Sequence, residues 1–162
     1  MRTQPRRGSH LPVLMKLIRS TWGPVLELGS GIYSTGFLHW ACYPTKRRLV
    51  TYEANTDWYN FAKQFEDDFH EVHCISSYDD MDPTPDWSIA FVDHAPDGRR
   101  VEDIKRLAHS DFVVAHDAEN KNDRKYRYST IYRLFKYRWK YSEPIIHTIV
   151  FSNKHDLSHF AV

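Results

Sequence analysis

Short apolar runs of strand type alternate along this chain with stripes of apolar residues at helical spacing, and this alternation limits the folds available to it. The strand-type runs cover residues 25–28, 49–52, 72–75, 87–92 and 112–115. Helical stripes lie in residues 11–18, 58–69, 101–108 and 128–135. Strands that alternate with helices form a mostly parallel sheet with helices on both faces. The pattern therefore predicts an α/β, doubly wound domain.

The last two strand-type runs, residues 137–141 and 145–151, are separated by a few residues that include Pro144. That gap is too short for a crossover helix, so the pair is expected to form an antiparallel hairpin. Five parallel strands and this hairpin give a mostly parallel seven-stranded sheet. With 162 residues the chain has room for one hydrophobic core, so we expect a single domain over residues 1–162.

Three local features refine the expected helices. The clearest helical stripe consists of Trp58, Phe61, Ala62, Phe65 and Phe69. Asn55 or Thr56 precedes it as a candidate N-cap, and Ser34 or Thr35 is a candidate cap for a helix after the first strand. The stripe with its cap predicts one long helix that extends to Phe69, and the second cap predicts a separate helix after the first strand.

Polar residues follow the strand-type runs where each run ends. They comprise residues 27–30 together with Glu53, Asp93, His116 and Asp117. Because ligands of doubly wound sheets bind beyond the carboxyl ends of the strands, we expect these side chains to gather at one rim.

A glycine turn follows the first strand, and acids accompany it. Gly29 and Gly31 allow a sharp turn and a close approach of a ligand to the backbone. Glu27 lies inside the apolar strand, where a carboxylate needs a partner. Glu53 ends the next strand, where an acid can accept hydrogen bonds from both hydroxyls of a ribose. A dinucleotide-binding loop would have glycine where Ser34 stands, which argues against a nicotinamide cofactor.

The run 26–31, Leu-Glu-Leu-Gly-Ser-Gly, followed by Thr-Tyr-Glu at 51–53, resembles the first two motifs of class I S-adenosylmethionine (SAM) dependent methyltransferases. The resemblance covers roughly residues 11–153 and includes the terminal hairpin, so it implies a Rossmann-like methyltransferase fold. It also implies SAM as cofactor, with the loop holding the methionine part, Glu53 the ribose, and Ser77 with Tyr78 the adenine. The predicted cofactor residues are Glu27, Gly29, Ser30, Gly31, Ser34, Glu53, Ser77, Tyr78 and Asp93.

A second cluster is expected from Asp93 and His94 at the end of one strand and His116 and Asp117 at the end of the next. Neighbouring strand ends lie about 5 Å apart, and two close carboxylates need a cation or a proton between them. The spacing is similar to that of metal-dependent O-methyltransferases of the catechol type. The resemblance implies a divalent metal such as magnesium, held by Asp93, Asp117 and His116. Ala118 stands where that family usually has an amide, and the lysine that serves there as base is missing.

Three metal-free interpretations of the second cluster stay open. His94 or His116 would act as general base, because an unperturbed histidine titrates close to neutral pH. Asp93 would bind the ammonium group of SAM, or would cap a helix, while His94 and His116 line the cleft. The candidate catalytic residues are therefore His94, His116 and Asp93.

Net charge is +1, yet residues 121–141 carry eight lysines and arginines interleaved with tyrosines and opposed only by Asp123. Such a segment suits a nucleic acid, although a solvated helix face and edge strand explain it as well. Arg2, Arg6 and Arg7 would join the same basic surface.

The expected function is methylation of an oxygen or nitrogen of a small molecule by SAM. The alternatives are a nucleic-acid or nucleotide methyltransferase, which would use the basic segment, and a catalytically silent SAM-binding or scaffold protein. A homo-oligomer would help to bind the acceptor, because no substrate domain is evident. Two cysteines without metal or redox spacing, and no apolar run of membrane length, predict a cytoplasmic protein without a membrane partner.

Overall fold

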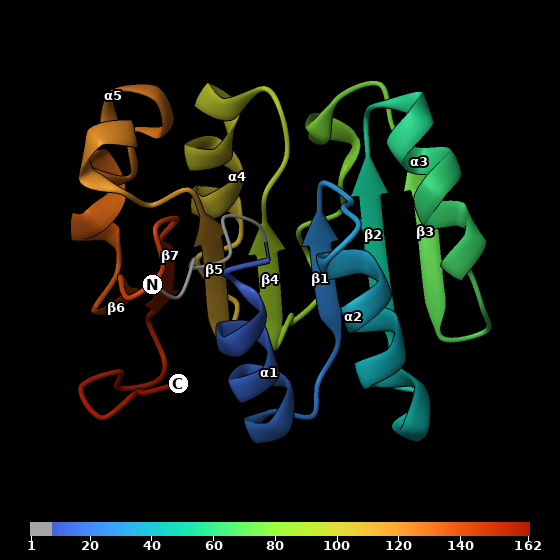
Figure 1. Ribbon diagram of the computed structural model, residues 1–162, viewed down its shortest axis with the longest axis horizontal. Helices are drawn as coiled ribbons and strands as arrows, with labels where there is room; N and C mark the ends of the chain where they lie inside the picture. Colours follow the sequence, from blue (N-terminus) through green and yellow to red (C-terminus); the bar gives the residue numbers. More distant parts are fainter. Residues whose placement is uncertain (1–7) are drawn as a thin grey trace, which may run out of the picture.

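Seven strands form one mixed sheet in the order β3-β2-β1-β4-β5-β7-β6, with helices on both faces (Figure 1). The computed structural model describes residues 8–162, so Arg2, Arg6 and Arg7 lie outside the described residues. The strands are β1 (Val25–Leu28), β2 (Leu49–Glu53), β3 (His70–Cys74), β4 (Ile89–Val92), β5 (Phe112–His116), β6 (Tyr137–Tyr141) and β7 (Thr148–Ser152). β1 to β5 pair in parallel, and β7 runs antiparallel to β5 and β6. The predicted doubly wound sheet and its antiparallel hairpin are confirmed.

Short helices connect the strands. The α-helices are α1 (Leu11–Ser20), α2 (Ser34–Cys42), α3 (Thr56–Ala62), α4 (Arg100–Arg106) and α5 (Asp123–Tyr126). The 3₁₀ segments are η1 (Tyr43–Thr45), η2 (Lys63–Phe65), η3 (Tyr78–Asp80), η4 (Asp97–Arg99), η5 (Asn120–Asn122) and η6 (Tyr128–Leu134). Within residues 8–162, none of the helices combines the length and the apolar content that a membrane span requires.

Two hydrophobic clusters sandwich the sheet. α1 and α2 pack Leu14 and Leu38 onto one face, and α4 and η6 pack Ile104 and Ile131 onto the other. Successive residues of a strand point to opposite faces, so β1 sends Leu26 and Leu28 into the α4 cluster and Val25 into the α1 cluster. This double coverage explains why the central strands are apolar at nearly every position.

Two predicted helices differ from the structure. α3 ends at Ala62 and continues only as η2, whereas Phe69 lies just before β3, where its carbonyl accepts from the Leu49 N–H. Phe65 and Phe69 nevertheless lie on the same side of the sheet, because both rings pack against His39. The predicted last helix is the 3₁₀ segment η6, whose three-residue period matches the spacing of Tyr128, Ile131 and Leu134.

The cap predictions had mixed outcomes. The Asn55 side chain accepts hydrogen bonds from the N–H groups of Asp57 and Trp58, which confirms it as the N-cap of α3. The prediction for α2 was wrong, because Tyr33 is the N-cap residue and makes no side-chain cap bond. Thr35 instead accepts a bond from the Gly31 N–H and faces the strand below it.

Candidate functional site

A pocket of about 320 Å³ opens beyond the carboxyl ends of β1, β4 and β5; we call it the rim pocket. Its lining residues are Gly8, His10, Gly31, Ile32, Tyr33, Ser34, Trp58, Asp93, His116 and Ile146. Four of the predicted site residues, Gly31, Ser34, Asp93 and His116, thus meet at one cavity. A larger hollow of about 470 Å³ lies beside α1 and Val162 and contains none of the predicted site residues.

The glycine turn is fixed by a close backbone approach. Gly29 has a φ of +88°, a conformation that L side chains rarely adopt. A Cβ on Gly29 would lie 2.6 Å from the Cα of His94. A Cβ on Gly31 would meet only the Ser34 hydroxyl, at 3.4 Å. Gly29 is therefore required by the fold itself, whereas Gly31 leaves open space on the pocket side.

Glu27 is fully buried beneath this turn and has the partners that its position demands. Thr35 and Thr51 donate hydroxyl hydrogen bonds to its carboxylate at 3.0 and 2.8 Å. Burial raises the pKa of Glu27 to about 7, although these hydrogen bonds act in the opposite direction. Glu27 thus braces the turn from below and does not line the rim pocket.

Glu53 ties the glycine turn to the end of β2. Its Oε2 accepts from the Ser30 N–H at 2.7 Å and from the Ser30 hydroxyl at 3.0 Å, while Oε1 accepts from the Asn55 N–H at 2.8 Å. A carboxylate offers about four acceptor positions, so these donors occupy most of its capacity. Binding of a ribose to Glu53 therefore requires the Ser30 hydroxyl to turn away.

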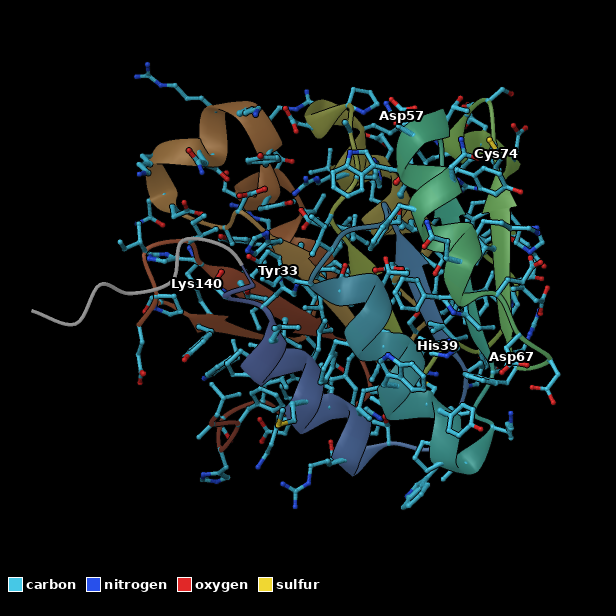
Figure 2. The ribbon with its side chains drawn as sticks, turned by 45° about the vertical axis from the view of Figure 1, so that its right-hand side comes forward. Tyr33, His39, Asp57, Asp67, Cys74 and Lys140 are labelled. Atoms are coloured by element: carbon cyan, nitrogen blue, oxygen red, sulfur yellow. The ribbon has the colours of Figure 1, made fainter. Side chains whose placement is uncertain are left out.

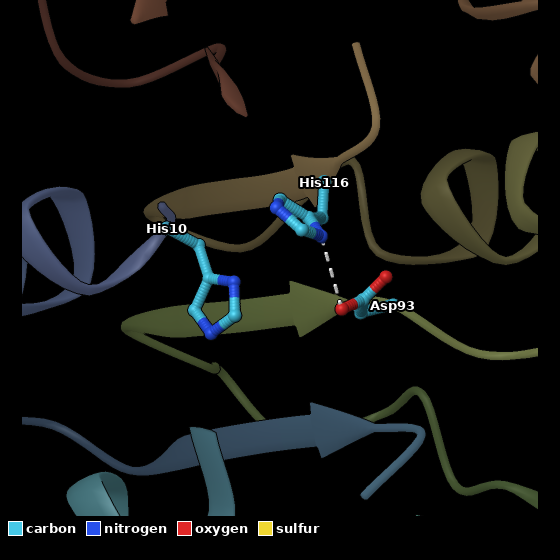
Figure 3. Close-up of side chains that lie close together, drawn as sticks. All are labelled: His10, Asp93 and His116. Carbon is cyan, nitrogen blue, oxygen red and sulfur yellow. Dashed lines mark ion pairs between the residues drawn. The ribbon is translucent and has the colours of Figure 1, made fainter. Parts of the chain in front are cut away.

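Asp93 and His116 form an ion pair at the floor of the rim pocket (Figure 3). The Asp93 Oδ2 lies 3.2 Å from the His116 Nδ1, and the opposite ring nitrogen, Nε2, lies 2.9 Å from the Ser9 hydroxyl. Burial alone would lower the pKa of His116, but the hydrogen bond and charge of Asp93 outweigh it and raise that pKa. The same pairing, with Arg100, lowers the pKa of Asp93 against its own burial.

The cation between Asp93 and Asp117 is a guanidinium group. Arg100, which is 4% exposed, places Nη2 at 3.0 Å from Asp93 and Nη1 at 3.2 Å from Asp117. The Tyr126 hydroxyl also donates to Asp117. The structure therefore does not place Asp93 and Asp117 around one shared open position, because the guanidinium of Arg100 lies between the two carboxylates.

His94 and the predicted adenine residues lie away from the rim pocket. His94 is buried, stacks on Tyr78 at 3.8 Å between ring centroids, and places Nε2 at 3.0 Å from Asp103. Tyr78 is 2% exposed, and the Ser77 side chain caps η3. The geometry therefore does not support His94 as a base, nor Ser77 and Tyr78 as an adenine surface.

The upper wall of the rim pocket is apolar and exposed. Ile32, Tyr33 and Trp58 are 60%, 45% and 41% exposed, and Tyr33 lies just before the first turn of α2 (Figure 2). An exposed apolar wall above a charged floor favours a ligand with a hydrophobic or planar part.

Sequence reasoning missed His10 and Trp58 as pocket residues. Trp58 was assigned to the core stripe, yet it faces the pocket from α3. His10 precedes α1, and no local pattern places it beside β4 and β5. A signal for Arg100 did exist, since two carboxylates at one rim require a cation.

No protein-family profile matches the sequence, and no curated protein is similar to it. Solved structures do match. A protein from Klebsiella pneumoniae assigned as an O-methyltransferase has 15% identity over 93% of this chain and 84% of that chain, with a TM-score of 0.65. The S-adenosylhomocysteine-bound methyltransferase PaMTH1 of Podospora anserina has 15% identity over 94% and 80%, with a TM-score of 0.64. Streptococcus pneumoniae Sp1610, assigned as a tRNA (m1A22) methyltransferase and solved with SAM, has 12% identity over 91% and 75%, with a TM-score of 0.59. The fold is therefore that of the class I SAM-dependent methyltransferases.

Proposed function

We propose that this protein binds SAM at the rim pocket and transfers its methyl group to an oxygen or nitrogen of a small molecule. The observation that carries the proposal is the convergence of the glycine turn, Asp93 and His116 on one cavity of a methyltransferase fold. Neighbouring structures of this fold hold SAM or S-adenosylhomocysteine.

The cofactor is assigned to the side of the pocket formed by the glycine turn. Gly31 and Ser34 approach the methionine part, and Glu53 accepts the ribose hydroxyls in place of the Ser30 hydroxyl. The exposed Trp58 provides an apolar ring on the same side of the rim pocket. Trp58 thus takes the place beside the adenine that the sequence analysis gave to Ser77 and Tyr78.

His116 is the candidate general base. Its Nδ1 faces Asp93, so a neutral ring with its proton on Nδ1 leaves the Nε2 lone pair free to accept a proton. The Ser9 hydroxyl lies at that atom, and an acceptor hydroxyl bound in the pocket would take its place. Methyl transfer from a sulfonium then requires in-line approach and removal of this proton.

A small acceptor is favoured over a nucleic acid because cations of the basic segment already have partners. Lys125 lies 2.7 Å from Asp97, Lys140 donates to Asn120, and Arg138 donates to the Tyr132 carbonyl. These contacts fit a solvated face. Methylation of nucleic acid and silent SAM binding remain the two alternatives that assays must separate.

The His116→Gln variant is expected to lower kcat for methyl transfer by about 10²-fold or more, because it removes the base. The measurement is transfer of a labelled methyl group from SAM to a panel of small hydroxyl and amine acceptors. In the wild type, kcat/KM should rise with pH through a group whose pKa lies above the ordinary histidine value, since His116 must lose its proton first.

His109→Gln, which changes an exposed histidine far from the pocket, is the matched control and should leave kcat unchanged. Affinity for S-adenosylhomocysteine should stay the same in both variants. Wild-type turnover by His116→Gln would exclude the proposed base. Binding without transfer to any acceptor would favour the silent SAM-binding protein.

A further inference from the structure

His10 is a buried histidine without a hydrogen-bond partner among residues 8–162. It is 4% exposed, and neither of its ring nitrogens finds a donor or acceptor there. A buried polar group left unpaired is costly, so such a group in a pocket wall calls for an occupant. His10 lines the rim pocket, and its ring stands edge-on to His116 at 4.7 Å between centroids.

Asp93 and His116 lie beside this ring (Figure 3). One ligand atom from each of His10, Asp93 and His116 lies within 4.8 Å of the others. The Asp93 Oδ2 and the His116 Nδ1 are 3.2 Å apart, close to the roughly 3.4 Å between two donors of a tetrahedral site with 2.0–2.1 Å bonds. One His10 ring nitrogen lies within 4.8 Å of a ligand atom of each of the other two residues, so an ion would be held by drawing these three atoms together.

The charges around the cluster leave room for a cation. Asp93 and Asp117 carry two negative charges, and Arg100 supplies one positive charge between them. One negative charge therefore remains when both histidines are neutral. Arg100 pairs with Oδ1 of Asp93, whereas Oδ2 is the oxygen that faces His116.

We propose that His10, Asp93 and His116 form a three-residue site for a divalent first-row transition metal of the zinc or cobalt type. Two imidazoles and one carboxylate suit these ions better than magnesium, which prefers oxygen ligands. With the metal on Nδ1, His116 carries its proton on Nε2 and donates it to the Ser9 hydroxyl. This outer hydrogen bond is the kind that fixes a metal-bound histidine.

Metal binding goes beyond the proposed function: the site lies at the acceptor end of the rim pocket, and the binding itself does not depend on SAM. The metal takes the position of the proton shared by His116 and Asp93, so it also excludes His116 from acting as base. In the metal-free protein His116 serves as the base, and in the metal-bound protein His116 and Asp93 serve as ligands.

The test titrates the metal-free full chain with Co²⁺ and follows the visible absorption of the bound ion, with Zn²⁺ affinity measured by calorimetry. The wild type should bind one ion per chain with a Kd at or below about 1 µM. His10→Gln should weaken binding at least about 100-fold, and Ser9→Ala about tenfold. His159→Asn, which changes an exposed histidine away from the pocket, should bind like the wild type.

Thermal unfolding of each variant shows whether it is folded. A wild type that binds no Co²⁺ at micromolar concentration, or a folded His10→Gln variant with unchanged affinity, would overturn the metal site. S-adenosylhomocysteine binding is measured on the same metal-free samples. If it persists while Co²⁺ does not bind, the metal inference fails and the proposed function stands; the reverse result removes the proposed function and keeps the metal site.

Discussion

Replacing Arg100 with methionine is expected to lower the free energy of unfolding by about 3–5 kcal/mol at neutral pH. The substitution keeps an unbranched apolar stem but leaves Asp93 and Asp117 without the guanidinium that lies 3.0 and 3.2 Å from them. It also removes the donor, Nε, that binds the His94 carbonyl at 2.7 Å. Urea unfolding followed by circular dichroism measures the loss.

The pH dependence identifies the cause of that loss. Asp93 has a lowered pKa in the wild type, so its pairing stabilises the protein above the ordinary carboxyl pKa and this contribution disappears as pH falls. In Arg100→Met the Asp93 carboxylate becomes easier to protonate, and the difference from wild type should shrink as pH falls toward about 4.

Two further variants complete this experiment. Arg124→Met, at an exposed arginine, should cost less than about 0.5 kcal/mol. Adding Asp117→Asn to Arg100→Met should restore part of the stability by removing one unpaired charge. A loss that does not change with pH would show that packing around Arg100, and not charge, decides its contribution.

The second large effect is expected from Gly29→Ala, which should destabilise the protein by about 2–5 kcal/mol. A positive φ costs an alanine about 1–2 kcal/mol, and steric overpacking adds about 1–3 kcal/mol. The new Cβ would lie 2.6 Å from the Cα atom of His94. This atom belongs to the backbone, so it cannot move aside as the end of a flexible side chain would. Thermal and urea unfolding report the effect directly.

Gly98→Ala is the matched control, because a Cβ there meets no atom within 4 Å. It should change stability by less than about 1 kcal/mol. Gly29→Ala with near-wild-type stability would contradict the close approach of the glycine turn to the end of β4.

The sheet could be predicted from the sequence because hydrophobic periodicity reports directly which face of each element is buried. The N-cap at Asn55 was predictable for another reason: its side chain binds backbone N–H groups only two and three residues further on. The 3₁₀ geometry of η6 and the early end of α3 depend on tertiary packing. Helix propensity, which reflects single residues, carries no information about that packing.

The site was only half predictable. Strand ends placed Asp93 and His116 correctly at one rim, and Glu27 was rightly expected to need partners. Successive side chains of an extended segment point to opposite sides, which explains why His94 turns away from the pocket that Asp93 lines. His10 could not be found, because a residue before α1 meets β4 and β5 only in the folded chain.

Calorimetric titration with S-adenosylhomocysteine, on the wild type and on Gly31→Ala, tests the central claim most directly. Gly31 lines the rim pocket, and a Cβ there meets only the Ser34 hydroxyl in the free protein, so the variant should fold normally. We expect the wild type to bind with a Kd of about 10 µM or tighter, and Gly31→Ala to bind at least about tenfold more weakly. A folded wild type that binds no S-adenosylhomocysteine, or equal affinity in both proteins, would contradict a cofactor site at the glycine turn.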